Sequence, residues 1–400
     1  MPGVLDGIRV LDLTNVLAGP FCAYQLALQG AEVIKVETPG TGDLARVLGH
    51  DPALSKQLMG ASFLAQNAGK TSITINLKSD AGKSVLMALV ATADVLIENF
   101  RPGVMDRLGI GQELLRAANP RLIYCAISGF GQSGPMRGAP AYDQIVQGFS
   151  GVMSITGDRE SAPLRVGYPV ADTLGGVTAA FAICAALTKQ ARTGEGSFID
   201  VSMLDSTLAT MGWVVSNYLM CGQAPEPMGN SNFTASPSGA FRTGDGLLNI
   251  AANKQEQYVA LAALIGRSDL VTDPRFASRE DRKKNRAALT IEVEAGLAAK
   301  SAIEWESILN KAGVPSGRVL SVPEALDLPQ VKGRGLVKSL GRRDGLDCQV
   351  QVLRSGFTIE GAEPDVSLPP PWLGEHTDEI LTSLGYTAED IAGLHERGDI

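Results

Sequence analysis

The first forty residues alternate between strand and helix patterns, and this alternation restricts the fold more than any other feature of the sequence. Residues 8–13 (IRVLDL) and 31–37 (AEVIKVE) are short apolar runs that predict strands, and residues 20–30 predict a helix that ends at a glycine. A strand, a crossing helix and a second strand form a βαβ unit, in which the two strands are parallel. The sequence therefore predicts a parallel sheet covered by helices.

The same pattern recurs over the first 200 residues. Ser79 and Asp80 are suited to cap a helix that runs to residue 91, and a long apolar helix is expected to start near Asp172. This half of the chain should therefore form an open α/β sheet. Its further strands are predicted at residues 71–76, 94–99, 121–128 and 198–202.

The character of the sequence changes after residue 203. A helix followed by a polar crossover is expected up to residue 234. Residues 238–241 and 247–252 then predict a short hairpin. Amphipathic helices are expected near residues 255–265, 285–299 and 302–312, and two short helices follow a Pro-rich turn in the tail.

These elements predict two domains, a large Rossmann-like α/β domain and a smaller α+β domain. The limits are residues 1–204 for the first part of the large domain, 205–234 for a crossover linker, 235–320 for the small domain, and 321–400 for a return linker and the C-terminal part of the large domain.

Charge and composition exclude several classes of protein. A net charge of −8 argues against non-specific nucleic-acid binding. The five scattered cysteines form no CxxC pair and are interpreted as buried small apolar residues, and with three histidines no metal site is expected. The longest apolar run, residues 174–187, is too short to span a bilayer and predicts a buried helix. We therefore expect a cytoplasmic protein without a membrane or nucleic-acid partner.

Two apparent nucleotide motifs are incomplete. Residues 67–72 (NAGKTS) look like the end of a phosphate-binding loop, but Leu64 stands where the first glycine belongs. The first strand is followed by TNVLAGP rather than GxGxxG, so Glu37 at the end of the second strand does not indicate a nicotinamide site. The TNVLAGP loop still lies at the carboxyl end of a strand, where open α/β sheets bind ligands. It is either such a site or a plain connection.

Asp172 allows two interpretations. It lies between Pro169 and a Gly175-Gly176 pair, just before the expected apolar helix. An aspartate there commonly caps the helix through its side chain. The alternative is a carboxylate that the helix dipole and free N–H groups keep ionised, which can act as a nucleophile.

Several segments together resemble the family III CoA-transferases, a group that includes formyl-CoA transferase and carnitine CoA-transferase. They occur in the family's order and cover essentially the whole chain. The resemblance implies a large Rossmann-like domain that uses both ends of the chain, with the small domain between them. It also implies a homodimer whose two chains pass through each other like linked rings. The matching segments are LDGIRVLDLT (5–14), Val16 with Ala18-Gly19-Pro20, GAEVIKVE (30–37), ENFRPG (98–103), SGFGQ (128–132), Tyr142-Asp143, PVAD (169–172), IDVSML (199–204) and LGEHTDE (373–379).

The resemblance also implies roles for single residues. Asp172 occupies the position of the family's nucleophile, which carries the acyl group and then CoA. Coenzyme A, as acyl-CoA, is then a substrate, and no metal is implied. The implied CoA contacts are Asn15, Val16, Ala18, Ile75, Lys78, Asn99, Phe100 and Arg107, and the implied contacts to the small acid are Leu17, Tyr142, Asp143, Ser238 and Gly239.

Three departures from the family pattern bear on the substrate. Leu17 replaces a glutamine of formyl-CoA transferase, and Ser238-Gly239 belongs to the nearest counterpart of its missing glycine-rich loop. These two departures predict that oxalate and formate are not substrates. Thr38 replaces an arginine near the nucleotide.

Succinyl-CoA is therefore the expected donor and a short dicarboxylate the expected acceptor, such as itaconate, mesaconate, citramalate or malate. Three arginines are candidates to hold a second carboxylate, namely Arg46, Arg137 and Arg165. The alternatives are a 2-methylacyl-CoA racemase and a non-catalytic CoA-binding protein. The related racemases use a histidine just before an aspartate as one of two opposed acid–base groups, and Tyr142 in that place is a poor base because its ordinary pKa is about 10.

Overall fold

The computed structural model describes residues 3–400 and divides into two compact units. The first unit contains three stretches of the chain, up to residue 152, 165–223 and 329–400. The second unit contains residues 153–164 and 224–328. Helices α9 (Met203–Thr210) and α10 (Gly212–Cys221) fill much of the stretch predicted as a crossover linker, and both belong to the first unit.

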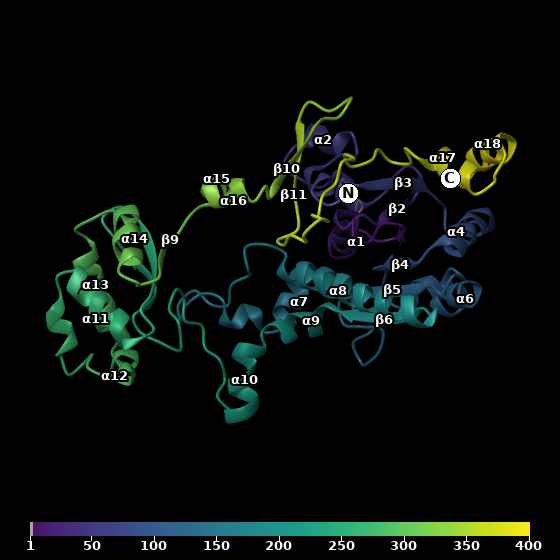
Figure 1. Cartoon of the computed structure of the whole chain (residues 1–400). Coiled ribbons are helices and arrows are strands. Elements are labelled where there is room, and N and C mark those ends of the chain that lie inside the picture. The colour runs from purple at the N-terminus through teal and green to yellow at the C-terminus, as the bar shows by residue number, and fades with distance from the viewer. Residues whose placement is uncertain (1–2) are drawn as a thin grey trace. The chain divides into compact units, whose positions relative to one another are not determined.

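A six-stranded parallel sheet forms the centre of the first unit, as the sequence predicts (Figure 1). The strand order is β3-β2-β1-β4-β5-β6, so the order reverses between β1 and β4. The crevice at such a reversal, beyond the carboxyl ends of the strands, is where open α/β sheets bind ligands. The strands are β1 (Arg9–Asp12), β2 (Glu32–Glu37), β3 (Lys70–Thr74), β4 (Val95–Glu98), β5 (Ile123–Ser128) and β6 (Ser197–Ser202).

Both faces of the sheet are apolar, which explains why its strands appear as nearly continuous hydrophobic runs. Alternate residues of one strand enter different cores: Val10 packs on the side of α1 (Ala18–Leu28) and α8 (Val170–Thr193), whereas Leu11 packs on the side of α4 (Asp80–Thr92). Helix α6 (Gln112–Ala118) joins α4 on that second side. As predicted, Ser79 caps α4 by accepting from the N–H of Gly82 (3.0 Å).

Helix α8 is long, apolar and close to α1. A β-carbon at Gly176 would lie 2.5 Å from the carbonyl oxygen of Ala18, so the glycine permits the close approach of the two helices. The helix is also long and apolar enough to cross a membrane by length and composition alone, with a hydropathy of 1.7. It covers the sheet with one face, but its other face is exposed, and Phe181 is 75% exposed. The prediction of a buried helix is therefore right for one face only.

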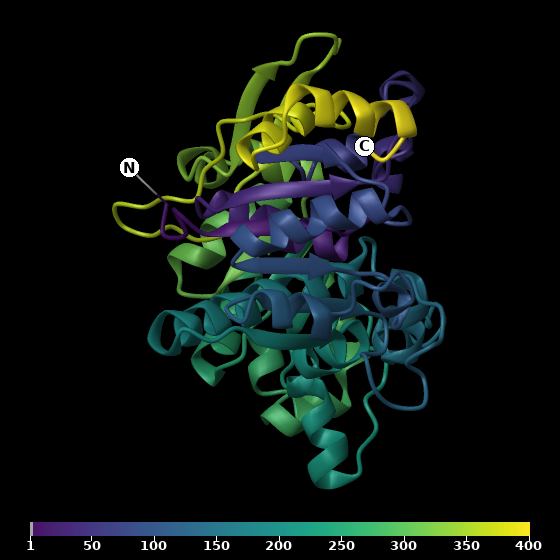
Figure 2. The same ribbon diagram turned by 90° about the vertical axis from the view of Figure 1, so that its right-hand side faces the viewer.

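The C-terminal part of the chain completes the first unit. Helices α17 (Thr377–Ser383) and α18 (Ala388–Arg397), drawn in yellow, lie at the β3 edge of the sheet (Figure 1 and Figure 2). The antiparallel hairpin of β10 (Val337–Arg342) and β11 (Gln349–Leu353) was not predicted and falls partly in the predicted return linker. The unit's shorter helices are 3-10 helix Leu44–Val47, α2 (Pro52–Lys56), α3 (Ala61–Leu64), α5 (Val104–Arg107), α7 (Asp143–Phe149) and α16 (Pro329–Gly333).

The second unit packs helices on a small antiparallel sheet. The predicted hairpin is present as β7 (Ser238–Arg242) and β8 (Leu247–Ala251), and β9 (Ser316–Arg318) pairs with β8. Its core gathers around aromatic residues such as Trp305 and Phe276. The helices are α11 (Gln255–Leu264), α12 (Arg279–Lys284), α13 (Arg286–Leu297), α14 (Ala302–Lys311) and α15 (Val322–Asp327), with 3-10 helices Val152–Ile155, at the boundary of the units, and Ser268–Val271.

Candidate active site

Asp172 is the third residue of α8 rather than the residue before it. The helix begins at Val170, and Pro169 precedes its first turn without a capping side chain. The interpretation of Asp172 as the helix cap is therefore wrong. Among residues 3–400, no donor is hydrogen-bonded to its carboxylate, so the carboxylate is available for another role.

Asp143 performs the capping from another helix. It is the first residue of α7, and its Oδ1 atom accepts from the N–H groups of Ala171 (2.9 Å) and Asp172 (3.5 Å). The side chain of Gln147 donates to Oδ2 of Asp143 (2.7 Å) and holds the carboxylate in place. Two carboxylates therefore share the N-terminus of α8, one bound to its backbone and one without a hydrogen bond.

Burial and the nearby charge of Asp143 raise the pKa of Asp172 to about 7. Burial and the second carboxylate oppose the helix dipole, which by itself would favour the ionised form of Asp172. A carboxylate with a pKa near neutrality can exist in both protonation states at physiological pH. Such a perturbed, partly buried acid is typical of a functional site.

The loop after β1 has a tightly fixed backbone. The side chain of Asn99 makes two hydrogen bonds to the backbone of Asn15. Its Oδ1 atom accepts from the N–H of Asn15, and its Nδ2 group donates to the carbonyl of Asn15 (both 2.8 Å). These bonds join the loops after β1 and β4 across the point where the strand order reverses. Val16 has a φ of 68°, a left-handed conformation that is unusual for a β-branched residue. Its N–H donates to Oδ1 of Asp43 (2.9 Å).

A buried charge network, which the sequence analysis missed, supports this loop. Lys35 contacts Oδ2 of Asp43 (2.9 Å) and donates to the carbonyl of Thr14 (3.0 Å), and Lys70 contacts Oδ2 of Asp12 (2.8 Å). Burial opposes the charged form of Asp12, but the two lysines hold its pKa at about 2. Charged residues inside the apolar strands IRVLDL and AEVIKVE were the available signal, because a charge there requires a partner.

The close packing of α1 on α8 brings this loop near Asp172. Ala18, the first residue of α1, faces Gly176, which lies one helical turn after Asp172. The structure thus brings together Leu17 and Ala18, Asp143 and Asp172 at two adjacent helix N-termini. Both N-termini place a positive dipole end here, but Asp143 already accepts from the first-turn N–H groups of Ala171 and Asp172 in α8.

The other predicted CoA contacts differ in how exposed their side chains are. Ile75 is almost completely buried after β3, so its side chain is not free to bind a ligand. Phe100 is partly buried and packs against the core on the α4 side of the sheet. Lys78 and Arg107 are exposed, so their side chains are accessible to the phosphates of CoA.

Among the predicted substrate contacts, Tyr142 is 65% exposed beside Asp143. Ser238 and Gly239 lie in β7 of the second unit. Gly239 has a φ of 151°, and a β-carbon there would lie 2.3 Å from the carbonyl oxygen of Asn230, so the close contact requires glycine.

Of the three candidate arginines, Arg46 is excluded as a substrate ligand. It is completely buried and binds both carboxylate oxygens of Glu37 at 2.7 Å. Arg137 is exposed on the loop before α7. The guanidinium of Arg165 lies 3.6 Å from Oδ2 of Asp143, so it is the candidate that the structure brings to the site.

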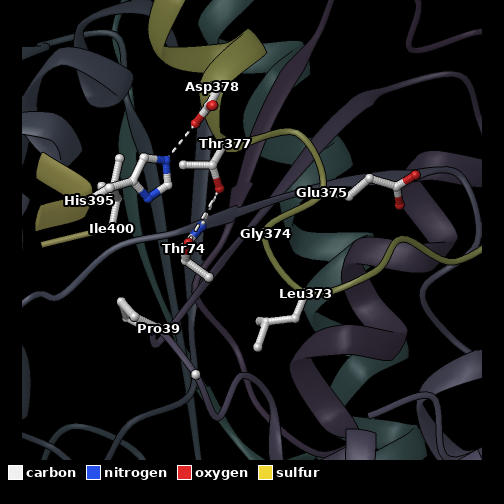
Figure 3. Close-up of a pocket in the computed structure, with 10 residues that line it drawn as sticks. Pro39, Thr74, Leu373, Gly374, Glu375, Thr377, Asp378, His395 and Ile400 are labelled. Atoms are coloured by element: carbon white, nitrogen blue, oxygen red, sulfur yellow. Dashed lines mark hydrogen bonds and ion pairs between the residues drawn. The ribbon is translucent and has the colours of Figure 1, made fainter. Parts of the chain in front are cut away.

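A pocket of about 400 Å³ lies near the carboxyl ends of β2 and β3 (Figure 3). His395 pairs with Asp378 at 2.8 Å on one wall, and the N–H of Thr74 donates to Oγ1 of Thr377 (3.1 Å). None of the predicted site residues lines this pocket, although Thr74 directly precedes Ile75. Within the described residues, no group of three or more His, Cys, Asp or Glu side chains is arranged to hold a metal ion.

Comparisons with known proteins agree on one family. The family model described as CoA-transferase family III matches residues 5–377. An acetyl-CoA:oxalate CoA-transferase of Acetobacter aceti is 44% identical over 85% of this chain and 87% of its own length. A succinate–glutarate CoA-transferase of Agrobacterium fabrum is 38% identical over 95% of both chains. The crystal structure of a CAIB/BAIF family protein from Brucella suis superposes with a TM-score of 0.85, at 35% identity, over 96% of this chain and all of the other.

Proposed function

The chain belongs to CoA-transferase family III, and on this premise we propose that it moves CoA from succinyl-CoA to a short dicarboxylic acid, with Asp172 as the covalent carrier. The observation that carries the assignment of Asp172 is its carboxylate, which is largely buried, without a hydrogen bond and next to the loop after β1. The capping role that would otherwise explain an aspartate here belongs to Asp143.

The proposed reaction replaces one difficult exchange by several easier steps. The carboxylate of Asp172 attacks the thioester carbonyl of the donor, which releases CoA thiolate and leaves a mixed anhydride. The thiolate attacks the aspartyl carbonyl of the anhydride, which gives an aspartyl-CoA thioester and frees the donor acid. The acceptor carboxylate then attacks this thioester, and the returning thiolate attacks the acceptor carbonyl, which forms the new acyl-CoA and restores Asp172. Because every intermediate can hydrolyse, the site must exclude water.

Names of relatives support a dicarboxylate as the acceptor. Beside the two transferases above, a relative of Chloroflexus aurantiacus, 36% identical over 99% of this chain, is named succinyl-CoA–D-citramalate CoA-transferase. Oxalate, glutarate and citramalate all carry two carboxylates. Oxalate therefore belongs among the candidate acceptors despite Leu17, because a relative at 44% identity is named for oxalate.

The racemase alternative is weaker in this site. Racemisation at an α-carbon needs two opposed acid–base groups. Tyr142 replaces the histidine of the racemases, and the carboxylate of Asp143 is engaged by two backbone N–H groups and Gln147. A non-catalytic binding protein would not need a buried carboxylate without a hydrogen bond.

We further propose a homodimer with interlocked chains and a cytoplasmic location. The dimer is supported by large apolar side chains that the single chain leaves exposed on α8 and α10, where burial against a second chain would remove them from water. These residues are Val177, Phe181, Trp213, Leu219 and Met220. The location rests on the sequence alone.

A trapping experiment tests the proposal. Incubation with succinyl-CoA and no acceptor should accumulate an aspartyl-CoA thioester or anhydride, which hydroxylamine converts to a hydroxamate. Peptide mapping should place the label between Val166 and Gly176, and the Asp172→Ala variant should give none. Solvent deuterium at the substrate α-carbon without a trapped ester would instead support the racemase. Transfer to a pool of carboxylic acids, read by mass spectrometry, identifies the acceptor.

A further inference from the structure

We propose that Arg165 binds the distal carboxylate of the dicarboxylic acid and so selects dicarboxylates over monocarboxylates. This inference rests on the proposed function and adds a specificity-determining residue to it. The first argument is position: Nη2 of Arg165 lies 3.6 Å from Oδ2 of Asp143, and Oδ1 of the same carboxylate accepts from the N–H of Asp172. The carboxylate of Asp143 therefore lies between the guanidinium of Arg165 and the backbone of Asp172, with one oxygen toward each.

The backbone beside Arg165 is held in place. The N–H of Val166 donates to Oε1 of Gln147 (2.9 Å), and the Nε2 group of Gln147 donates to Asp143. Gln147 is completely buried. One side chain thus fixes both the backbone next to Arg165 and the carboxylate that the guanidinium faces, so the base of the Arg165 side chain does not lie on a free surface loop.

The guanidinium keeps donors available for a ligand. An arginine has five N–H donors, and its planar fork suits a carboxylate. In the part of the chain that the structure describes, no hydrogen bond uses the Arg165 side chain, which is 48% exposed. Its single ion pair, at 3.6 Å, is longer than a charge-assisted hydrogen bond. A substrate carboxylate can therefore bind without displacing an existing hydrogen bond.

Charge balance near Asp172 also favours this assignment. The environment of Asp172 contains a second carboxylate, Asp143, which repels an incoming dianion. Arg165 supplies the positive charge that offsets this repulsion. The rival Arg46 is fully occupied by Glu37, and Lys78 and Arg107 are assigned to the CoA phosphates.

The test compares two acceptors of equal chain length, glutarate and pentanoate, which differ only in whether one end is a carboxylate or a methyl group. Succinyl-CoA, the proposed donor, is supplied at saturating concentration and initial rates are measured, so that loading of Asp172 is the same for both acceptors. In Arg165→Gln, kcat/KM for glutarate should fall by about 10- to 100-fold, as expected for a lost charge-assisted contact. The value for pentanoate should stay within about two-fold, and Arg165→Lys should recover part of the loss for glutarate.

Arg192→Gln is the matched control, because it removes the same charge from an exposed position near the other end of α8. It should leave both acceptors unchanged. An equal loss for both acceptors in Arg165→Gln would mean that Arg165 only supports Asp143, and unchanged selectivity would likewise overturn the proposal. If the unaltered enzyme makes no new CoA ester at all, the proposed function fails and the role of Arg165 with it.

Discussion

The carboxylate of Asp172 is partly buried beside a second carboxylate, and this determines how catalysis should depend on pH. Only the ionised form is a nucleophile, and its pKa is raised to about 7. We therefore expect the rate of loading by acyl-CoA to rise with pH up to about 7 and then to level off, with about a ten-fold loss at pH 6 relative to the plateau. Single-turnover loading at low acyl-CoA concentration, measured from pH 5 to 9, checks this, and a flat profile would contradict it.

The Asp143→Asn variant tests the cause of that pKa. An amide oxygen can still accept from the N–H of Ala171, but it carries no charge. Removing the like charge should lower the pKa of Asp172, so the rising limb of the loading profile should move to lower pH. A limb that stays in place would show that burial alone raises the pKa. Gln147→Glu, which adds a charge beside Asp143, should move the limb the opposite way.

The same carboxylate should reduce the stability of the fold at high pH. Below about pH 4 Asp172 is protonated in both the folded and unfolded states, and between pH 4 and 7 the folded state binds more protons, so stability falls as pH rises through this window. Asp172→Asn should therefore be inactive and more stable than the unaltered protein at pH 8, by a few kcal/mol, but equal to it at pH 4. Urea unfolding at the two pH values measures this. Equal stability at pH 8 would refute the burial of a charged carboxylate.

The sequence placed Asp172 in the site but not its surroundings. Asp143 lies 29 positions earlier, and nothing local to either residue shows that one carboxylate caps the helix of the other. Arg46 appeared as available as Arg165, because an isolated arginine does not reveal whether Glu37 folds against it. Such pairings depend on tertiary packing, which a single sequence without its fold does not specify.

At the scale of elements, the contact between α1 and α8 should be sensitive to a single methyl group. Gly176→Ala places a β-carbon 2.5 Å from the carbonyl oxygen of Ala18, so one helix must move. We expect a loss of about 1 to 3 kcal/mol in the free energy of unfolding, together with reduced transfer, since both helix N-termini shift. Gly148→Ala in α7 is the control: it meets no atom within 4 Å and should be neutral or stabilising by up to about 1 kcal/mol. Equal effects in the two variants would contradict the close contact.

The buried ion pairs beneath the loop after β1 should matter far more than similar pairs on the surface. Lys70→Met leaves the buried Asp12 with only Lys35, at 3.7 Å, and should cost roughly 3 to 5 kcal/mol. Lys83→Met breaks an exposed pair with Asp80 in α4 and should change stability little. Denaturant unfolding of both variants distinguishes these cases. A small effect of Lys70→Met would mean that water reaches Asp12.

Strands and helices with a buried apolar face were predictable from the sequence, whereas the exposed strand β10 was missed. The parallel strands alternate between two apolar cores, so their hydrophobic runs are visible in sequence. Strand β10 has no buried residue, and its sequence VKSLGR lacks the apolar signal of a strand. Strand β11 does alternate, with Val350 and Val352 buried, and this pattern was available but not used.

At the scale of the whole molecule, the proposed interlocked homodimer predicts that the folded protein exists only as a dimer. Chains that pass through each other cannot separate without unfolding, so dilution should not give folded monomers. Sedimentation velocity from micromolar to nanomolar concentration should show one species of dimer mass. A compact, folded monomer at high dilution would contradict the interlocked arrangement.

Substitution of Phe181 tests which surface forms that dimer. Phe181→Glu places a charge on the exposed stripe of α8, and burying it against a second chain would be costly. Because the chains cannot fold apart, the expected result is a loss of soluble protein rather than a stable monomer. Phe357→Glu is the matched control, since Phe357 is also exposed but lies outside α8 and α10, in a stretch without helix or strand. Soluble, active dimer from Phe181→Glu would place the interface elsewhere, and equal losses in both variants would show that the effect is not specific to α8.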